Sequence, residues 1–298
     1  MAETPSTHSA GVEDVRGGAL ATAATVAAVG TRRCEDPAGG PSSVAPAAQG
    51  TLLPVSPPTP ARLWVVRHGE SAGNIARERA EAARLDRIDL AHRDVDVPLS
   101  DNGEEQAAAL GRYLRSLDEP PTVLWTSPYV RAEQTAAIAL DRAGLQLPRV
   151  VDERLREREF GVLDGLTGQG IRSLFPDEAE RRKKIGKFYH RPPGGESWSD
   201  VLLRLRAALA DLGREAEGER VLLVAHQVVV LLVRYVLEQM TEGEILAIDR
   251  AADVANCSVT DYRSQDGRLV LEAYNLVDHL ERSDADVTAE PDTPHAAR

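Results

Sequence analysis

Aromatic residues, cysteines and long hydrophobic segments are all scarce in this chain of 298 residues. Aromatics make up 4% of the residues although 42% are hydrophobic, so a core must be built mainly from leucine, valine, alanine and isoleucine. No apolar stretch approaches the roughly 20 residues that a membrane-spanning helix needs. An alanine- and threonine-rich run at 19–29 follows acidic residues, whereas a secretory signal peptide begins with basic ones. The composition therefore predicts a globular chain with no membrane segment.

The two cysteines, Cys34 and Cys257, are too few to form a disulfide framework or a metal cage. This cysteine usage is typical of a reducing compartment, and we expect a cytoplasmic protein. No histidine or carboxylate pair has ligand spacing such as His-x-His or His-Glu-x-x-His, so we expect neither a metal nor another cofactor. Basic charge is also in deficit, since the net charge is −12, and this argues against nucleic-acid binding.

Composition divides the chain into three parts. Residues 1–61 are rich in alanine, proline, glycine, serine and threonine, and we expect a disordered tail because such a segment buries little apolar surface. Residues 281–298 are acidic and are expected to form a flexible C-terminal tail. Residues 62–280, in which apolar segments recur, are expected to form one domain.

Three short apolar segments of this domain end where reactive side chains begin. Helical patterns separate them, and the clearest, at about 101–117, has apolar residues at steps of three and four. Alternating strands and helices predict an α/β fold with a mostly parallel sheet, in which ligands bind beyond the carboxyl ends of the strands. The three junctions are 63–66 before Arg67 and His68, 122–125 before Ser127 and Arg131, and 220–225 before His226.

His68 stands beside the permanent cation of Arg67 and before the flexible Gly69. The guanidinium fork binds phosphate oxygens, and a glycine lets the backbone approach them closely. An imidazole in this position is suited to attack a bound phosphoryl group. A histidine that merely caps a strand is the alternative, but two imidazoles and two guanidiniums meeting at one sheet edge favour a site for a phosphate dianion.

A dense cluster of charges at 155–161 ends in Phe160 and Gly161. One interpretation is a solvent-exposed loop. The other is a loop that holds an acid over the reacting centre, and Glu157 and Glu159 are the competing candidates for that acid.

Residues 176–195 are expected to form a second loop-rich stretch, with six basic side chains between Arg181 and Arg191. Prolines and glycines at 192–195 would restrain and bend it. The stretch is either a solvated basic face or a stiff lid that attracts a second anionic group of the substrate. The lid hypothesis predicts that Arg181 and Arg182 contact substrates with two anionic groups, such as bisphosphates or phospho-carboxylates.

These motifs resemble the histidine phosphatase superfamily, branch 1, which includes phosphoglycerate mutases and many phosphatases. The resemblance covers roughly residues 62–280 and implies a three-layer α/β/α sandwich of the phosphoglycerate mutase-like type. It rests on Arg-His-Gly-Glu-Ser from Arg67 with Asn74, Ser127-Pro128 followed by Arg131, Gln134 and Thr135, Leu155-Arg156-Glu157 before Phe160-Gly161, and Ala225-His226.

The resemblance implies a role for each matching residue. His68 would be the nucleophile that becomes phosphohistidine, and Glu157 would protonate the leaving alkoxide and then activate water. The implied phosphate pocket consists of Arg67, Asn74, Arg131 and His226. Further substrate contacts are expected from Ser71, Gln227, Arg181 and Arg182. Gln227 stands where many members have glycine, although fructose-2,6-bisphosphatase domains also have His-Gln there.

The resemblance implies a metal-independent phosphomonoesterase that acts on a small phosphorylated metabolite. A mutase is the first alternative, but mutases of this family carry a long insertion after the acid, and the spacing from Glu157 to His226 is short. The pair Arg181-Arg182 resembles a mutase arginine pair and keeps that alternative open. A catalytically silent protein that binds phosphorylated ligands is the second alternative, although it would normally have lost His68 or the acid.

Overall fold

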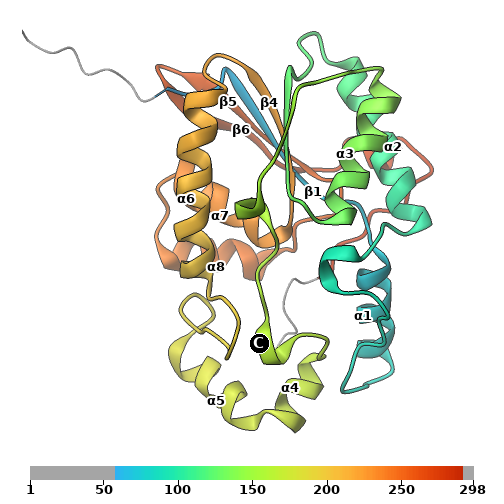
Figure 1. The fold of residues 1–298 in the computed structure, drawn as a ribbon, viewed down its shortest axis with the longest axis vertical. Coiled ribbons are helices and arrows are strands. Elements are labelled where there is room, and N and C mark those ends of the chain that lie inside the picture. Colours follow the sequence, from blue (N-terminus) through green and yellow to red (C-terminus); the bar gives the residue numbers. More distant parts are fainter. Residues whose placement is uncertain (1–57, 291–298) are drawn as a thin grey trace, which may run out of the picture. The chain divides into compact units, whose positions relative to one another are not determined.

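The computed structural model of the protein describes residues 58–290. These residues form a six-stranded sheet with helices on both faces (Figure 1). Most of the expected N-terminal tail, residues 1–57, and the end of the chain, 291–298, lie outside the described residues. No helix between residues 58 and 290 is both long and apolar enough to cross a membrane.

The sheet has the strand order β3-β2-β4-β1-β5-β6. β1, β2, β3 and β4 run parallel to one another, whereas β5 is antiparallel to β1 and β6 is antiparallel to β5. The predicted α/β fold with a mostly parallel sheet is therefore confirmed. The strands are β1 Arg62–Arg67, β2 Val123–Thr126, β3 Arg149–Val151, β4 Arg220–Ala225, β5 Val259–Gln265 and β6 Arg268–Leu276.

Helices cover both faces of the sheet, which gives the three predicted layers. α6 and α7 lie on one side of the strands, and α2 and α3 lie on the other (Figure 1). The helices are α1 Ala72–Ala82, α2 Asp101–Ser116, α3 Val130–Ala143, α4 Gly168–Leu174, α5 Pro176–Ile185, α6 Trp198–Glu215, α7 Gln227–Leu237, α8 Glu242–Ala251 and α9 Asp278–Glu281.

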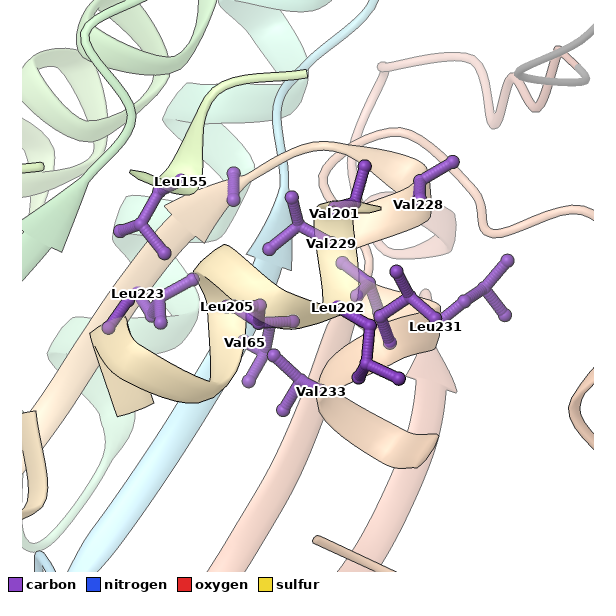
Figure 2. Close-up of a cluster of buried hydrophobic side chains, with 14 of the residues drawn as sticks. Val65, Leu155, Val201, Leu202, Leu205, Leu223, Val228, Val229, Leu231 and Val233 are labelled. Atoms are coloured by element: carbon purple, nitrogen blue, oxygen red, sulfur yellow. The ribbon is translucent and has the colours of Figure 1, made fainter. Parts of the chain in front are cut away.

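Side chains of the central strands alternate between two apolar clusters, as the period of two in a strand requires. On β1, Val65 points into the cluster under α6 and α7, whereas Val66 points into the cluster under α2 and α3. Figure 2 shows the first cluster, where Leu205 of α6 and Val229 of α7 meet Val65. Since both faces of β1 and β4 are buried, the sequence of each reads as a continuous apolar run.

The helix α5 differs from the prediction, which expected a loop-rich stretch over residues 176–195. Pro176 occupies its first turn, where a missing N–H costs nothing, and Asp177 and Glu178 follow beside the positive end of the helix dipole. Basic residues fill its last turn, at the negative end. None of its residues is buried, so no apolar stripe marked the segment as a helix.

Residues 281–290, which we expected in a flexible tail, contact the domain. The amide of Gln106 on α2 donates to the carbonyl of Asp286 at 2.7 Å. The backbone N–H of Asn256 donates to the carbonyl of Thr288 at 2.9 Å. Because the segment takes part in these contacts through its backbone carbonyls, its acidic composition did not reveal them.

Candidate active site

The ends of three parallel strands bring the predicted site residues together. Arg67 at the end of β1 pairs in register with Ala225 at the end of β4, and Thr126 at the end of β2 pairs with Val224. The backbone N–H of His68 continues this ladder and donates to the carbonyl of Ala225 at 2.9 Å. The strand ends therefore share one edge of the sheet, as the sequence predicted.

The environment of His68 fixes its tautomer. Its Nδ1 lies 2.7 Å from the carbonyl oxygen of Gly69, and since a carbonyl only accepts, Nδ1 carries the proton. Nε2 therefore keeps its lone pair, and Nε of Arg131 donates to it at 3.3 Å. Burial, with the charges of Arg131 and Arg67, holds the pKa of His68 well below its ordinary value. The ring is thus a neutral imidazole near pH 7, with its free nitrogen beside a guanidinium.

The backbone around His68 is anchored from β5 and its preceding loop. The N–H of Cys257 donates to the carbonyls of both Arg67 and His68, at 3.0 and 3.2 Å. Cys257 has a φ of 54°, in the left-handed region that few non-glycine residues adopt. The side-chain amide of Asn256 donates to the carbonyl of His68 at 3.1 Å. These contacts hold the nucleophile loop at the end of the strand.

The packing around Gly69 gives a reason for glycine in addition to the approach of backbone to phosphate that the sequence suggested. A Cβ atom at this position would lie 2.7 Å from the carbonyl oxygen of Gly103 on α2, closer than real atoms pack. The N–H of Gly69 donates to Oγ1 of Thr135 on α3 at 3.0 Å. Glycine is required here because the loop presses against α2.

The side chain of Arg131 reaches across the site from the first turn of α3. Its Nη1 donates to the carbonyl of Asp94 at 2.6 Å and lies 3.0 Å from a carboxylate oxygen of the same residue. The guanidinium also stacks over the ring of Tyr129. Asp94 thus holds Arg131 with its Nε directed at His68.

His226 is completely buried next to His68. The two rings have centroids 5.2 Å apart, and Nε2 of His226 lies 2.8 Å from Oγ of Ser127. Its Nδ1 lies 3.9 Å from Oε2 of Glu157. Burial and the charge of Arg131 lower its pKa well below the ordinary value, so it is neutral near pH 7.

Glu157, one of the two candidate acids, is placed in this group. It is buried, and its Oε1 accepts a hydrogen bond of 2.7 Å from the backbone N–H of Arg158. Glu159 is exposed and accepts a long hydrogen bond of 3.4 Å from the hydroxyl of Tyr129. The geometry therefore favours Glu157 as the acid, because only Glu157 of the two faces His226 and lines the cavity.

A cavity of about 210 Å³ opens at this edge of the sheet. Its lining combines cationic side chains and His68 with apolar side chains and three carboxylates. Its walls are formed by Arg67, His68, Ser71, Gly73, Asn74, Arg77, Ile88, Leu90, His92, Asp94, Val97, Arg131, Glu157, Phe160, Asp164 and Gly165. No group of three or more potential metal ligands occurs within residues 58–290.

Ser71 and Asn74 reach the cavity as the N-terminal cap of α1. Oγ of Ser71 accepts from the backbone N–H of Asn74, and Oδ1 of Asn74 accepts from the backbone N–H of Ser71. This reciprocal pair satisfies two backbone donors of the first turn and orients both side chains.

The other three expected substrate contacts do not line the cavity. Gln227 is buried, and its amide donates to Asp253 at 3.3 Å. Arg181 and Arg182 lie on α5, where Arg181 is exposed. The structure therefore gives no support to the predicted substrate contacts of these three residues.

Sequence reasoning missed Asp94, Asn256 and Arg204, although each contacts a predicted site residue. Asp94 lies 37 positions from its partner Arg131, and Asn256 lies 188 positions from its partner His68. Arg204 donates to the carbonyl of Glu157 at 3.1 Å from the middle of α6. Their sequence neighbourhoods resemble any polar surface, so no local pattern could have identified them.

Comparisons with known proteins agree with this geometry. A 6-phosphofructo-2-kinase/fructose-2,6-bisphosphatase from Aquarana catesbeiana is 32% identical over 185 residues, which is 62% of this chain and 34% of that protein. This chain thus spans about a third of that relative. A 2,3-bisphosphoglycerate-dependent phosphoglycerate mutase from Methylobacterium radiotolerans is 32% identical over 186 residues, which is 61% of this chain and 82% of the mutase.

The fold has solved counterparts as well. The structure of a mycobacterial glucosyl-3-phosphoglycerate phosphatase superposes with a TM-score of 0.58 at 27% identity, over 73% of this chain and 99% of that chain. The sequence model of the histidine phosphatase superfamily (branch 1) matches residues 63–277, which include the six strands apart from Arg62 and all the residues that line the cavity. On this match the chain belongs to branch 1 of the histidine phosphatase superfamily.

Proposed function

We propose that this protein is a metal-independent phosphomonoesterase that hydrolyses a small phosphorylated metabolite through a phosphohistidine intermediate. The observation that carries the proposal is the state of His68. Its Nδ1–H is bound to the carbonyl of Gly69, and its Nε2 lone pair faces the guanidinium of Arg131. A neutral imidazole in this tautomer is a nucleophile, and Arg131 would hold the phosphoryl group against it.

Two steps account for hydrolysis. In the first, Nε2 of His68 bonds to phosphorus as the bond from phosphorus to the ester oxygen breaks, and Glu157 gives its proton to that oxygen. In the second, Glu157 takes a proton from water, the water oxygen bonds to phosphorus, and the phosphorus–nitrogen bond breaks. Arg67 and Arg131 would stabilise the charge on the non-bridging oxygens in both steps.

The test uses 4-nitrophenyl phosphate with a metal chelator present. We expect turnover and a phosphoenzyme that is labile in acid and stable in base, as a phosphohistidine is. His68→Ala should lose about 1,000-fold or more of the activity and all of the phosphoenzyme. His279→Gln, which changes a histidine outside the cavity, should retain both. Phosphate bound to serine, or full activity in His68→Ala, would contradict the mechanism.

Transfer of the phosphoryl group to a second hydroxyl is the other candidate, and the similarity to a phosphoglycerate mutase favours it. The two functions differ only in the acceptor of the second step. The test isolates radiolabelled phosphoenzyme and incubates one half in buffer and the other half in buffer that contains 3-phosphoglycerate. We expect the label to appear as inorganic phosphate in both. Label on the phosphoglycerate would support the mutase, and phosphate binding without any turnover would support a catalytically silent protein.

A further inference from the structure

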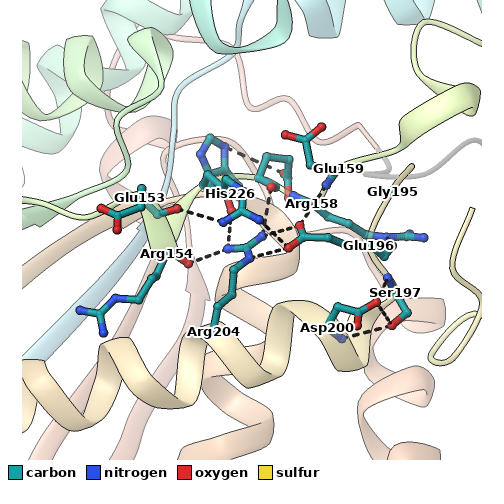
Figure 3. A network of polar contacts seen from close by, with 12 residues as sticks. Glu153, Arg154, Arg158, Glu159, Gly195, Glu196, Ser197, Asp200, Arg204 and His226 are labelled. Carbon is teal, nitrogen blue, oxygen red and sulfur yellow. Dashed lines mark hydrogen bonds and ion pairs between the residues drawn. The ribbon is translucent and has the colours of Figure 1, made fainter. Parts of the chain in front are cut away.

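The loop that carries Glu157 curves around the guanidinium group of Arg204, which projects from α6 (Figure 3). Nη1 of Arg204 donates to the carbonyls of Arg154 and Arg156, at 2.5 and 2.9 Å. Nη2 donates to the carbonyl of Glu157 at 3.1 Å. Three carbonyls within four residues thus converge on one side chain, which fixes the path of the backbone into the acid.

Glu196 holds Arg204 from the opposite side and also ties down the residues around the acid (Figure 3). Its two carboxylate oxygens accept from Nε and Nη2 of Arg204, at 3.0 and 2.9 Å. The same oxygens accept from the side chain of Arg156 at 2.7 Å and from the backbone N–H of Glu159 at 3.2 Å. Burial alone would raise the pKa of Glu196, but the hydrogen bond and charge of Arg204 lower it, so the carboxylate stays ionised.

These contacts use every donor that Arg204 has. A guanidinium carries five N–H groups, and the five hydrogen bonds above account for all of them. The Arg204 side chain is 10% exposed and does not line the cavity. It therefore has no donor left for a substrate, and any effect on the reaction must pass through the loop.

We infer that Arg204 and Glu196 are positioning residues for the general acid Glu157. This inference rests on the proposed function. Oε1 of Glu157 accepts from the backbone N–H of Arg158, and Oε2 faces His226. The position of the acidic proton therefore depends on the backbone segment to which Arg204 donates its hydrogen bonds. Proton transfer requires the acid within hydrogen-bond reach of the leaving oxygen. Arg67 and Arg131 lie on β1 and α3, outside the loop that Arg204 contacts. We therefore expect phosphate binding to be independent of Arg204.

A purely structural ion pair is the competing explanation, and the chain offers a matched control for it. Arg234 on α7 binds Glu238 through two hydrogen bonds of 2.8 and 2.9 Å, and its side chain is 9% exposed. Like Arg204, Arg234 binds its glutamate through Nε and Nη2 and is about nine-tenths buried, but it makes no hydrogen bond to the loop. Arg234→Lys therefore reports what loss of a buried arginine pair does to the enzyme in general.

The experiment compares two esters that differ in their need for an acid. 4-Nitrophenolate leaves without protonation, whereas the leaving group of phenyl phosphate has a pKa of about 10, like the tyrosine side chain. Arg204→Lys should lower kcat/KM, which reports the steps up to the phosphoenzyme, by about 30-fold for phenyl phosphate and by less than about 3-fold for 4-nitrophenyl phosphate, because general acids contribute about 100-fold or more. Glu157→Gln should show the same selectivity, and Arg234→Lys should show none.

Hydrogen exchange of the full chain gives a second readout that does not need activity. Backbone amides of residues 154–159 should exchange faster in Arg204→Lys than in the wild type, and their exchange rates should be unchanged in Arg234→Lys. Glu196→Gln provides the same test if Arg204→Lys does not fold, because glutamine can accept on only one side where the carboxylate accepts on both.

Equal losses of kcat/KM for the two esters in Arg204→Lys, or unchanged exchange in 154–159, would overturn the inference. A failure of the proposed function would look different. The wild type would then release no phosphate from either ester, while exchange in 154–159 would still report whether Arg204 and Glu196 hold the loop.

Discussion

Arg77 on α1 is a cation in the cavity wall that the phosphate pocket does not account for. It lines the cavity together with His68 and Arg131, and its Nη1 is buried without a hydrogen-bond partner among the described residues. A buried donor without a partner is costly, and a ligand can remove that cost. Arg77 therefore competes with Arg181 and Arg182 as the contact for a second anionic group.

Arg77→Ala should raise KM for a bisphosphate or a phospho-carboxylate by about 10-fold, because a charged hydrogen bond contributes about 1.5–3 kcal/mol. KM for 4-nitrophenyl phosphate, which lacks a second anion, should barely change. The measurement is KM for both substrate types at low and high salt, with Arg181→Ala/Arg182→Ala as the matched comparison. A larger effect in the double variant would show that the basic residues of α5, and not Arg77, contact the second anionic group.

The residues that could be predicted from sequence are those whose neighbours in the chain identify them. His68 and His226 each follow a buried strand, and Arg131 opens a helix after another. The charge cluster alone left Glu157 and Glu159 open, and the resemblance selected Glu157 by its place after Leu155-Arg156; the structure adds that Glu157 faces His226. Arg204 was not predicted because the carbonyl groups to which it donates lie about 50 positions away.

At the scale of elements, α6 is an amphipathic helix whose two faces can be compared directly. Leu205 is fully buried against the sheet in the cluster of Figure 2, whereas Leu203 is 71% exposed on the same helix. Leu205→Ala should lower the free energy of unfolding by about 3 kcal/mol, because it deletes buried methyl groups and leaves a cavity. Urea denaturation measures this, and Leu203→Ala, expected within about 0.5 kcal/mol of the wild type, is the control. Similar losses in both would contradict this account of the core.

Elements with a clear apolar period were predicted almost to the residue. β4 begins and ends where its apolar run does, and α2 begins at the residue expected from its pattern. Ser100 caps α2 by accepting from the N–H of Gly103. The prediction of a loop at α5 was wrong because none of its residues is buried, so periodicity does not detect the helix, although the charges at its two ends favour one.

At the scale of the whole molecule, the active site is assembled from segments at opposite ends of the domain. The carboxylate of Glu290, from the C-terminal segment, lies 4.0 Å from Nη2 of Arg67, and the charge of Arg67 opposes the rise that burial causes in the pKa of Glu290. The residues at the three strand ends could be predicted from local sequence patterns. The contact between Glu290 and Arg67 depends on packing between distant parts of the chain, which local patterns do not show. Composition marked that segment only as acidic.

Histidines with lowered pKa values make the global stability depend on pH, and His279 on α9, which is half-buried and lies outside the candidate active site, allows one such effect to be isolated. Its ring nitrogen Nε2 lies 3.0 Å from the carbonyl of Cys257. Burial lowers its pKa to about 4, although the hydrogen bond to Cys257 and the charge of Asp278 oppose the shift. The folded protein therefore keeps His279 neutral at pH values where the unfolded chain protonates it.

The sign of the effect follows from proton binding. The unfolded pKa is about 6.5, so between pH 6.5 and pH 4 the unfolded chain binds more protons at His279 and stability falls as the pH falls. His279→Gln removes this difference while glutamine can still donate to the Cys257 carbonyl. Between pH 7.5 and pH 5 the wild type should thus lose about 2 kcal/mol more unfolding free energy than the variant, measured in urea at constant salt. His68 and His226 contribute equally to both proteins and cancel. Equal losses would show that His279 is protonated, or exposed, in the folded state.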